Sequence, residues 1–267
     1  MTDPAGPRRR LPLGDLGPRL FSGLALAGLG IAVVAIGGWV LALTVSLAVA
    51  VMAWELARMG GATDARPLAA ATGVVCLLSL VLPEGWGVPL LLLPAFLGVA
   101  QLPHHRLSFA VFTGLMLIAG FGLVHVRAEF GAGWMTWLIL VVVATDIAGY
   151  FAGRLIGGPK FWPRISPKKT WSGTVAGWVG AGLVGLVAAR LLGASAEVVG
   201  LSIGLSMASQ LGDIAESALK RRVGVKDSSA LIPGHGGLFD RFDGILGAMV
   251  LFLMVEQIVG FPPRPWG

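Results

Sequence analysis

Residues 217–243 read SALKRRVGVKDSSALIPGHGGLFDRFD, and this charged stretch separates two strongly apolar segments of the chain. The 267 residues are 55% hydrophobic and 13% charged, with a mean hydropathy of +0.82, whereas soluble domains carry about 25% charged residues. The chain is therefore predicted to lie mostly in a membrane. Because charge is costly beside membrane-embedded segments, the charged stretch is expected to have a function.

Outward from this stretch, apolar segments recur at a length of about 15 to 20 residues, which is enough to cross a hydrocarbon core of about 30 Å. They predict an all-α, polytopic integral membrane protein with about nine transmembrane helices. The predicted spans are about 20–36, 39–54, 68–82, 88–102, 108–125, 134–152, 174–192, 198–216 and 244–260. Since no polar interval is long enough for a soluble domain, we expect a cytoplasmic N-terminal tail at 1–19 and a single transmembrane domain at 20–267.

The distribution of basic residues predicts the orientation of these spans. Of the 20 Lys and Arg residues, only Arg127, Arg190 and Arg264 lie in one alternate set of flanks, and all others lie in the opposite set. By the positive-inside rule, the N-terminus is cytoplasmic. The topology thus accounts for the net charge of +6, and no nucleic-acid partner is expected. The 40 glycines favour close helix packing and make a homodimer reasonable.

Acidic residues flank the charged stretch in two pairs with the same spacing. Asp213 and Glu216 share a helix face, which Lys220 continues one turn later. Asp240 and Asp243 repeat the spacing at the start of the last span. Converging carboxylates would suit Mg²⁺, and two cations could hold both the attacking and the leaving oxygen of a phosphoryl displacement. The alternative is a salt-bridge network at the membrane surface, in which the acids pair with Lys220, Arg221, Arg222 and Arg241.

The turn PGHGG at residues 233–237 lies between the two acidic pairs. Its glycines would let backbone amides approach an anion, as phosphate-binding loops do. His235 could bind a phosphate oxygen or move a proton near neutral pH, although a lone histidine is more often a structural hydrogen-bonding residue.

A second charged loop, GRLIGGPKFWPRISPKKTWSG at 153–173, is expected on the same side of the membrane, so the two loops could share one site. Its glycines and prolines disfavour a simple helix. Basic residues clustered with hydroxyls fit a multiply charged phosphate ligand. The candidate residues are Arg154, Ser166, Lys168, Lys169 and Thr170. Just upstream, Asp146 is a functional candidate because an acid within a span is costly.

These motifs resemble those of the phosphatidate cytidylyltransferases, also called CDP-diacylglycerol synthases. The signature reads Ser217-x-Leu219-Lys220-Arg221, Lys226-Asp227 and His235-Gly236-Gly237-x-x-Asp240-Arg241-x-Asp243. The strong part of the resemblance covers about 145–245, and a weaker match is Trp54-Glu55. Three positions depart from the pattern: Ser172 where the family often has Glu, Ser229 where Gly is common, and Gly244 where Ser is common.

The resemblance implies that a phosphate oxygen of phosphatidate attacks the α-phosphorus of CTP, so that pyrophosphate leaves and CDP-diacylglycerol forms. Phosphatidate is already anionic, so the enzyme must chiefly overcome the repulsion between two polyanions. The implied setting is a bacterial inner (plasma) membrane, with membrane lipids around the protein and the active site facing the cytoplasm.

The resemblance also implies roles for individual residues. The implied catalytic residues are Asp213, Asp240, Asp243, Lys220, His235 and Arg241. The implied ligands of Mg²⁺, with a second cation as an option, are Asp213, Asp240, Asp243, Asp146 and Glu216. The implied substrate-binding residues are Ser166, Lys168, Lys169, Thr170, Arg154, Arg221, Lys226, Asp227, Gly236 and Gly237.

Two other classes of protein were weighed against this interpretation. Membrane CDP-alcohol phosphotransferases carry an Asp-Gly-x-x-Ala-Arg element, but Asp243-Gly244 is followed here by Ile-Leu-Gly-Ala-Met, which excludes that class. A transporter would usually place its site residues near mid-membrane in corresponding halves, whereas the first half offers Glu55 and little else. Transport of a small anion and a nucleotide other than CTP remain the alternatives.

Overall fold

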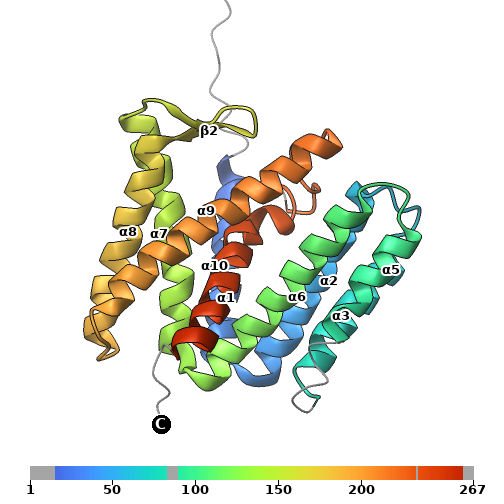
Figure 1. Cartoon of the computed structure of the whole chain (residues 1–267), viewed down its shortest axis with the longest axis horizontal. Helices are drawn as coiled ribbons and strands as arrows, with labels where there is room; N and C mark the ends of the chain where they lie inside the picture. Colours follow the sequence, from blue (N-terminus) through green and yellow to red (C-terminus); the bar gives the residue numbers. More distant parts are fainter. Residues whose placement is uncertain (1–15, 83–89, 233, 261–267) are drawn as a thin grey trace, which may run out of the picture.

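The computed structural model describes residues 16–82, 90–232 and 234–260, and Figure 1 shows the arrangement of its helices. Six helices in this part of the chain are long and apolar enough to cross a membrane. They are α2 (Gly38–Met59), α6 (Arg106–Glu129), α7 (Gly131–Leu155), α8 (Trp171–Leu191), α9 (Glu197–Val223) and α10 (Phe239–Val259). The structure therefore supports an integral membrane protein.

Three further helices lie where the other predicted spans fall. They are α1 (Leu16–Ile36), α3 (Arg66–Ser79) and α5 (Leu93–Gln101). At 1.5 Å per residue, the 14 residues of α3 and the 9 residues of α5 are too short to span a hydrocarbon core of about 30 Å. The predicted count of nine crossings is thus not confirmed. Most of the predicted tail at 1–19 lies outside the described residues.

The prediction of an all-α fold is wrong for the loop between α7 and α8. Strand β1 (Lys160–Trp162) pairs antiparallel with β2 (Ser166–Thr170), and Trp162 faces Ser166 across the hairpin. Prolines at 159, 163 and 167 explain the difference, because proline within a helix removes a hydrogen bond and clashes with the preceding turn.

The helix ends and the hairpin that carry many of the basic residues gather at one end of the bundle. Figure 1 shows β2, the end of α9 and the start of α10 there, together with the end of α2. The α8–α9 connection and the end of α10 lie at the other end. This grouping agrees with the alternation of basic flanks, while the side that faces the cytoplasm stays a prediction.

Glycines allow α9 and α10 to cross at very close range. A Cβ atom on Gly247 would collide with the backbone oxygen of Ala208, and one on Gly212 would collide with the backbone oxygen of Asp243. Small residues permit such backbone contact between membrane helices. The crossing brings Asp213, the residue after Gly212, next to the turn of α10 that carries Asp243.

Polar side chains add hydrogen bonds between α7, α8 and α9. Thr145 donates to Ser206 at 2.8 Å, and the indole of Trp178 donates to Gln210 at 2.9 Å. Buried apolar residues of α2, α6 and α10, among them Met116, Leu117 and Phe252, form much of the hydrophobic core. Through these hydrogen bonds and the close crossing described above, α9 packs against α7, α8 and α10.

Candidate active site

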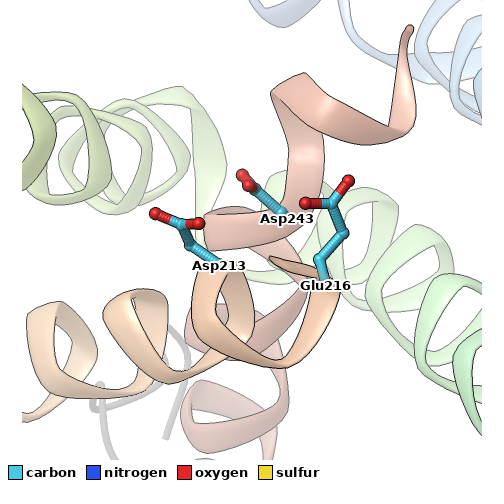
Figure 2. A group of neighbouring side chains, drawn as sticks. All are labelled: Asp213, Glu216 and Asp243. Carbon is cyan, nitrogen blue, oxygen red and sulfur yellow. The ribbon is translucent and has the colours of Figure 1, made fainter. Parts of the chain in front are cut away.

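Three carboxylates from α9 and α10 converge near the end of the bundle that carries the basic loops. One oxygen from each of Asp213, Glu216 and Asp243 lies within 4.8 Å of the others, and Figure 2 shows the side chains reaching from the two helices into a common region. Glu216 is fully buried, while Asp213 and Asp243 are half-buried. Below, this group is called the carboxylate trio.

The trio fits a hard divalent cation. Glu216 Oε1 is buried and has no hydrogen-bond partner among the described residues, while Oε2 lies 2.5 Å from Lys220 Nζ. A buried carboxylate oxygen without a donor is costly. Three oxygen donors on two rigid helices are the ligand type that Mg²⁺ prefers. The residues present thus match the predicted cation in the chemistry of their donor atoms.

Asp240 lies beside Glu216, because both carboxylates contact Lys220 Nζ, but it is already saturated with donors. Its carboxylate accepts from Lys220 Nζ at 2.6 Å and from the backbone amides of Ser228 and Gly237 at 2.9 and 2.8 Å. The hydroxyl of Ser228 adds a contact at 3.1 Å. Although Asp240 and Asp243 share a helix face, this arrangement favours a structural role for Asp240 over the predicted role as a metal ligand.

Lys220 lies between the two groups of acids. Its side chain is largely buried, and its Nζ contacts both Glu216 and Asp240. The predicted salt-bridge alternative therefore describes Lys220 well. Within the described part of the chain, no ion pair joins Arg221, Arg222 or Arg241 to an acid, so the network does not extend over the other basic residues.

The hairpin between α7 and α8 brings a second basic residue to the trio. Lys169 of β2 forms an ion pair with Asp213 of α9, so the hairpin contacts the acidic part of α9, while a site shared by the two charged loops stays a prediction. Thr170 instead caps α8, because its hydroxyl accepts from the amide of Gly173 at 3.2 Å. Arg154 is exposed and donates to the hydroxyl of Tyr150 at 2.8 Å.

The other predicted substrate-binding residues, on the hairpin, the last turn of α9 and the α9–α10 loop, form no hydrogen bond or ion pair with the trio among the described residues. Lys168, Arg221, Lys226 and Asp227 are exposed, and Ser166 is half-buried in β2. They lie at the same end of the bundle as the trio but do not build it.

Asp146 of α7 is a fourth acid near the trio. It is exposed, and it interacts electrostatically with Asp213, Asp243, Lys169 and Arg241. The predicted acid in the sixth span therefore belongs to the same charged neighbourhood, and it also brings Arg241 within range of the site.

His235 contacts a different part of the molecule. Its Nδ1 lies 2.9 Å from the hydroxyl of Ser22 in α1, which favours the structural role noted for a lone histidine. The amide of Gly237 is also committed, because it donates to Asp240. The predicted contact of this glycine with a phosphate stays a prediction. Pro233 of this turn lies outside the described residues.

Glu55, near the end of α2, has a larger part in the structure than its weak motif match indicated. Its carboxylate is fully buried and accepts four hydrogen bonds from the α9–α10 loop and the start of α10. The donors are Ser228 Oγ at 3.1 Å, Ser229 Oγ at 2.6 Å, Leu238 N at 2.9 Å and Phe239 N at 2.8 Å. A lone acid at the end of an apolar span was the available signal.

Comparison with known proteins finds similar proteins that share one printed name. A phosphatidate cytidylyltransferase of Brucella suis biovar 1 (strain 1330) is 44% identical over 165 residues, which are 61% of this chain and 60% of that protein. One from Mycobacterium bovis (strain ATCC BAA-935 / AF2122/97) is 39% identical over 145 residues, covering 54% of this chain and 47% of that protein. The match thus spans 60% or less of each relative's length.

The model of the cytidylyltransferase family matches residues 18–259, which include every helix from α2 to α10 and the whole carboxylate trio. The resemblance predicted from the motifs is thereby confirmed, and the chain belongs to the cytidylyltransferase family.

Proposed function

We propose that this protein transfers the cytidylyl group of CTP to phosphatidate, giving CDP-diacylglycerol and pyrophosphate for phospholipid synthesis. The observation that carries the proposal is the carboxylate trio, which has an unpartnered buried oxygen on Glu216 and faces Lys169 of the basic hairpin. The family match and the names of the relatives support the choice of reaction.

In this reaction, an anionic phosphate oxygen of phosphatidate forms a bond to the α-phosphorus of CTP. The bond between that phosphorus and the bridging oxygen to the β-phosphate breaks, and the electron pair leaves with pyrophosphate. No strong general base is needed because the attacking oxygen already carries charge. The protein must hold two polyanions in line and reduce their repulsion.

The residues of the site divide this work. Asp213, Glu216 and Asp243 would hold Mg²⁺, and Asp146, which interacts electrostatically with Asp213 and Asp243, would help to hold a second cation. Mg²⁺, when bound, would offset charge on the phosphates of CTP and of the departing pyrophosphate. Lys169 and Arg241 would add positive charge from the protein, and Lys220 keeps Glu216 in place from inside.

The setting is part of the same proposal. The trio would face the cytoplasm at the bacterial inner membrane, where CTP is supplied from water and phosphatidate from the surrounding lipid leaflet. The exposed residues Arg154, Lys168, Arg221 and Lys226 would attract the anionic substrates to this end of the protein. A homodimer stays compatible with the glycine-rich helices.

The test is incorporation of labelled CTP into chloroform-extractable lipid by the whole purified chain in detergent. We expect label in lipid only when both phosphatidate and Mg²⁺ are present, and none with a chelator. The absence of labelled lipid under every condition, from folded protein, would refute the proposal. A preference for another nucleoside triphosphate would refute the choice of CTP.

Removal of a trio carboxylate should abolish turnover without unfolding the protein. We expect Asp213→Asn and Asp243→Asn to fall below about a tenth of the wild-type rate, since the loss of one electrostatic group at such a site costs about 10²- to 10³-fold. The matched control is Glu129→Gln, which changes an exposed acid at the last residue of α6, outside the trio. Retention of more than a tenth of the activity would contradict the metal-ligand assignment.

A further inference from the structure

Glu55 is a fully buried carboxylate that lies far from the charged loops in sequence. It forms no ion pair with any basic residue in the described part of the chain, so hydrogen bonds must replace a countercharge. Two of its four donors are the backbone amides of Leu238 and Phe239 at the start of α10, where the helix dipole also favours an acid. The cost of burying this charge is offset only while the loop keeps its present conformation.

A continuous line of polar contacts leads from Glu55 to the trio. The hydroxyl of Ser228 lies 3.1 Å from both Glu55 Oε2 and Asp240 Oδ2. Asp240 accepts from Lys220 at 2.6 Å, and Lys220 contacts Glu216 at 2.5 Å. Every member of this line is buried. A displacement of Ser228 would therefore shift Asp240 and Lys220, and the shift of Lys220 would move Glu216.

The paired glycines of the loop have no room for a side chain beside this line. A Cβ atom on Gly237 would collide with the hydroxyl of Ser228 and lie 2.5 Å from Glu55 Oε1. Gly236 has φ +85°, and its Cβ atom would lie 2.7 Å from Asp240 Oδ2. The absence of side chains at Gly236 and Gly237 thus makes room for the contacts of Glu55 and Asp240.

We infer that Glu55 is a positioning residue for the active site. It fastens the α9–α10 loop and the start of α10 to α2, and it sets the position of Glu216 through Ser228, Asp240 and Lys220. The strongest sequence motifs all lie between about 145 and 245, so this inference gives the first half of the chain a direct part in building the site. The inference about Glu55 depends on the proposed function in one respect only, namely which reaction the metal site performs.

The first test measures the site without using activity. Binding of Mn²⁺, as a spectroscopic substitute for Mg²⁺, is followed by electron paramagnetic resonance on the full chain in detergent. Since loss of a residue that supports metal ligands typically costs about 10- to 100-fold in affinity, we expect Glu55→Ala to weaken binding at least about tenfold. Glu55→Gln keeps the size and one acceptor oxygen, so it should restore part of that loss. Glu256→Gln, a buried carboxylate at the other end of α10, should bind as the wild type does.

The second test measures the loop itself. Arg222, in the last turn of α9, and Lys226, at the start of the loop, are exposed trypsin sites. We expect Glu55→Ala and Ser228→Ala to be cleaved there about tenfold faster than wild type, and Glu256→Gln at the wild-type rate. Wild-type Mn²⁺ affinity in Glu55→Ala would overturn the inference, even if the loop were cleaved faster. If Glu55→Ala does not fold, the same comparison in Glu55→Gln and Ser228→Ala decides the matter.

A failure of the proposed function would look different from a failure of this inference. If the wild type binds Mn²⁺ but transfers no cytidylyl group, the reaction assignment falls and the role of Glu55 is still measured. If the wild type transfers the group and Glu55→Ala binds Mn²⁺ normally, the role of Glu55 falls alone.

Discussion

The close crossing of α9 and α10 predicts that one added methyl group, which touches no side chain of the carboxylate trio, will disable the site. Gly247 lies on α10, four residues after Asp243, and a Cβ atom there would collide with the backbone oxygen of Ala208 and lie 3.1 Å from the amide of Gly212. Neither backbone can rotate away as a side chain could. The variant Gly247→Ala must therefore push the helices apart.

The size of the effect follows from the required movement. Ordinary contact begins at 3.4 Å, so the helices must separate by about 1 Å at this point to relieve the overlap. Asp213 and Glu216 would move with α9, and Asp243 would move with α10. A misplacement of 1 Å can cost about 10²-fold in rate, while overpacking costs about 1–3 kcal/mol of stability. We expect the protein to fold and kcat to fall about a hundredfold.

The assay is cytidylyl transfer to lipid at saturating substrates, together with size-exclusion chromatography in detergent to show that the protein is folded. Gly204→Ala is the matched control, because its Cβ atom would meet only Leu251 Cδ2 of α10, at 3.5 Å. A wild-type kcat in Gly247→Ala would refute the reasoning. An equal loss in Gly204→Ala would show that the effect is not specific to the tight crossing.

Further predictions concern the Lys169–Asp213 ion pair and the His125–Glu256 hydrogen bond. Lys169→Ala should lower kcat/KM for CTP by about 10- to 100-fold, because a hydrogen bond to a charged group contributes about 1.5–3 kcal/mol. Lys160→Ala, on the same hairpin, is the control and should keep the wild-type value. Steady-state kinetics of both variants measures the difference. His125→Ala removes the 2.8 Å contact to the buried Glu256, so thermal unfolding in detergent should show a loss of about 1 kcal/mol. Activity at low temperature should be unchanged, and a large loss of activity would contradict a purely structural role.

Local pattern determined much of this protein. Long apolar segments predict helices in a membrane, since an unpaired backbone cannot remain in lipid. The three-residue spacing of Asp213 and Glu216 puts both on one face of α9, because neighbours on a helix are fixed by its pitch. The motifs between 145 and 245 indicated the family, which the comparison confirmed. The short α3 and α5 show the limit of hydropathy, since apolar length in sequence does not fix where a helix ends.

Only the tertiary structure decided which acids meet. Asp240 and Asp243 have the same spacing as the first pair, yet Asp243 joins the trio, while Asp240 binds Lys220 and the loop amides. Lys169 reaches Asp213 across the hairpin, and Glu55 reaches Ser228 across 173 residues of sequence. The physical reason is that helix pitch fixes neighbours within a helix, whereas contacts between helices depend on how closely two backbones approach. That approach is set by the glycines of α9 and α10, and their partners cannot be identified from spacing alone.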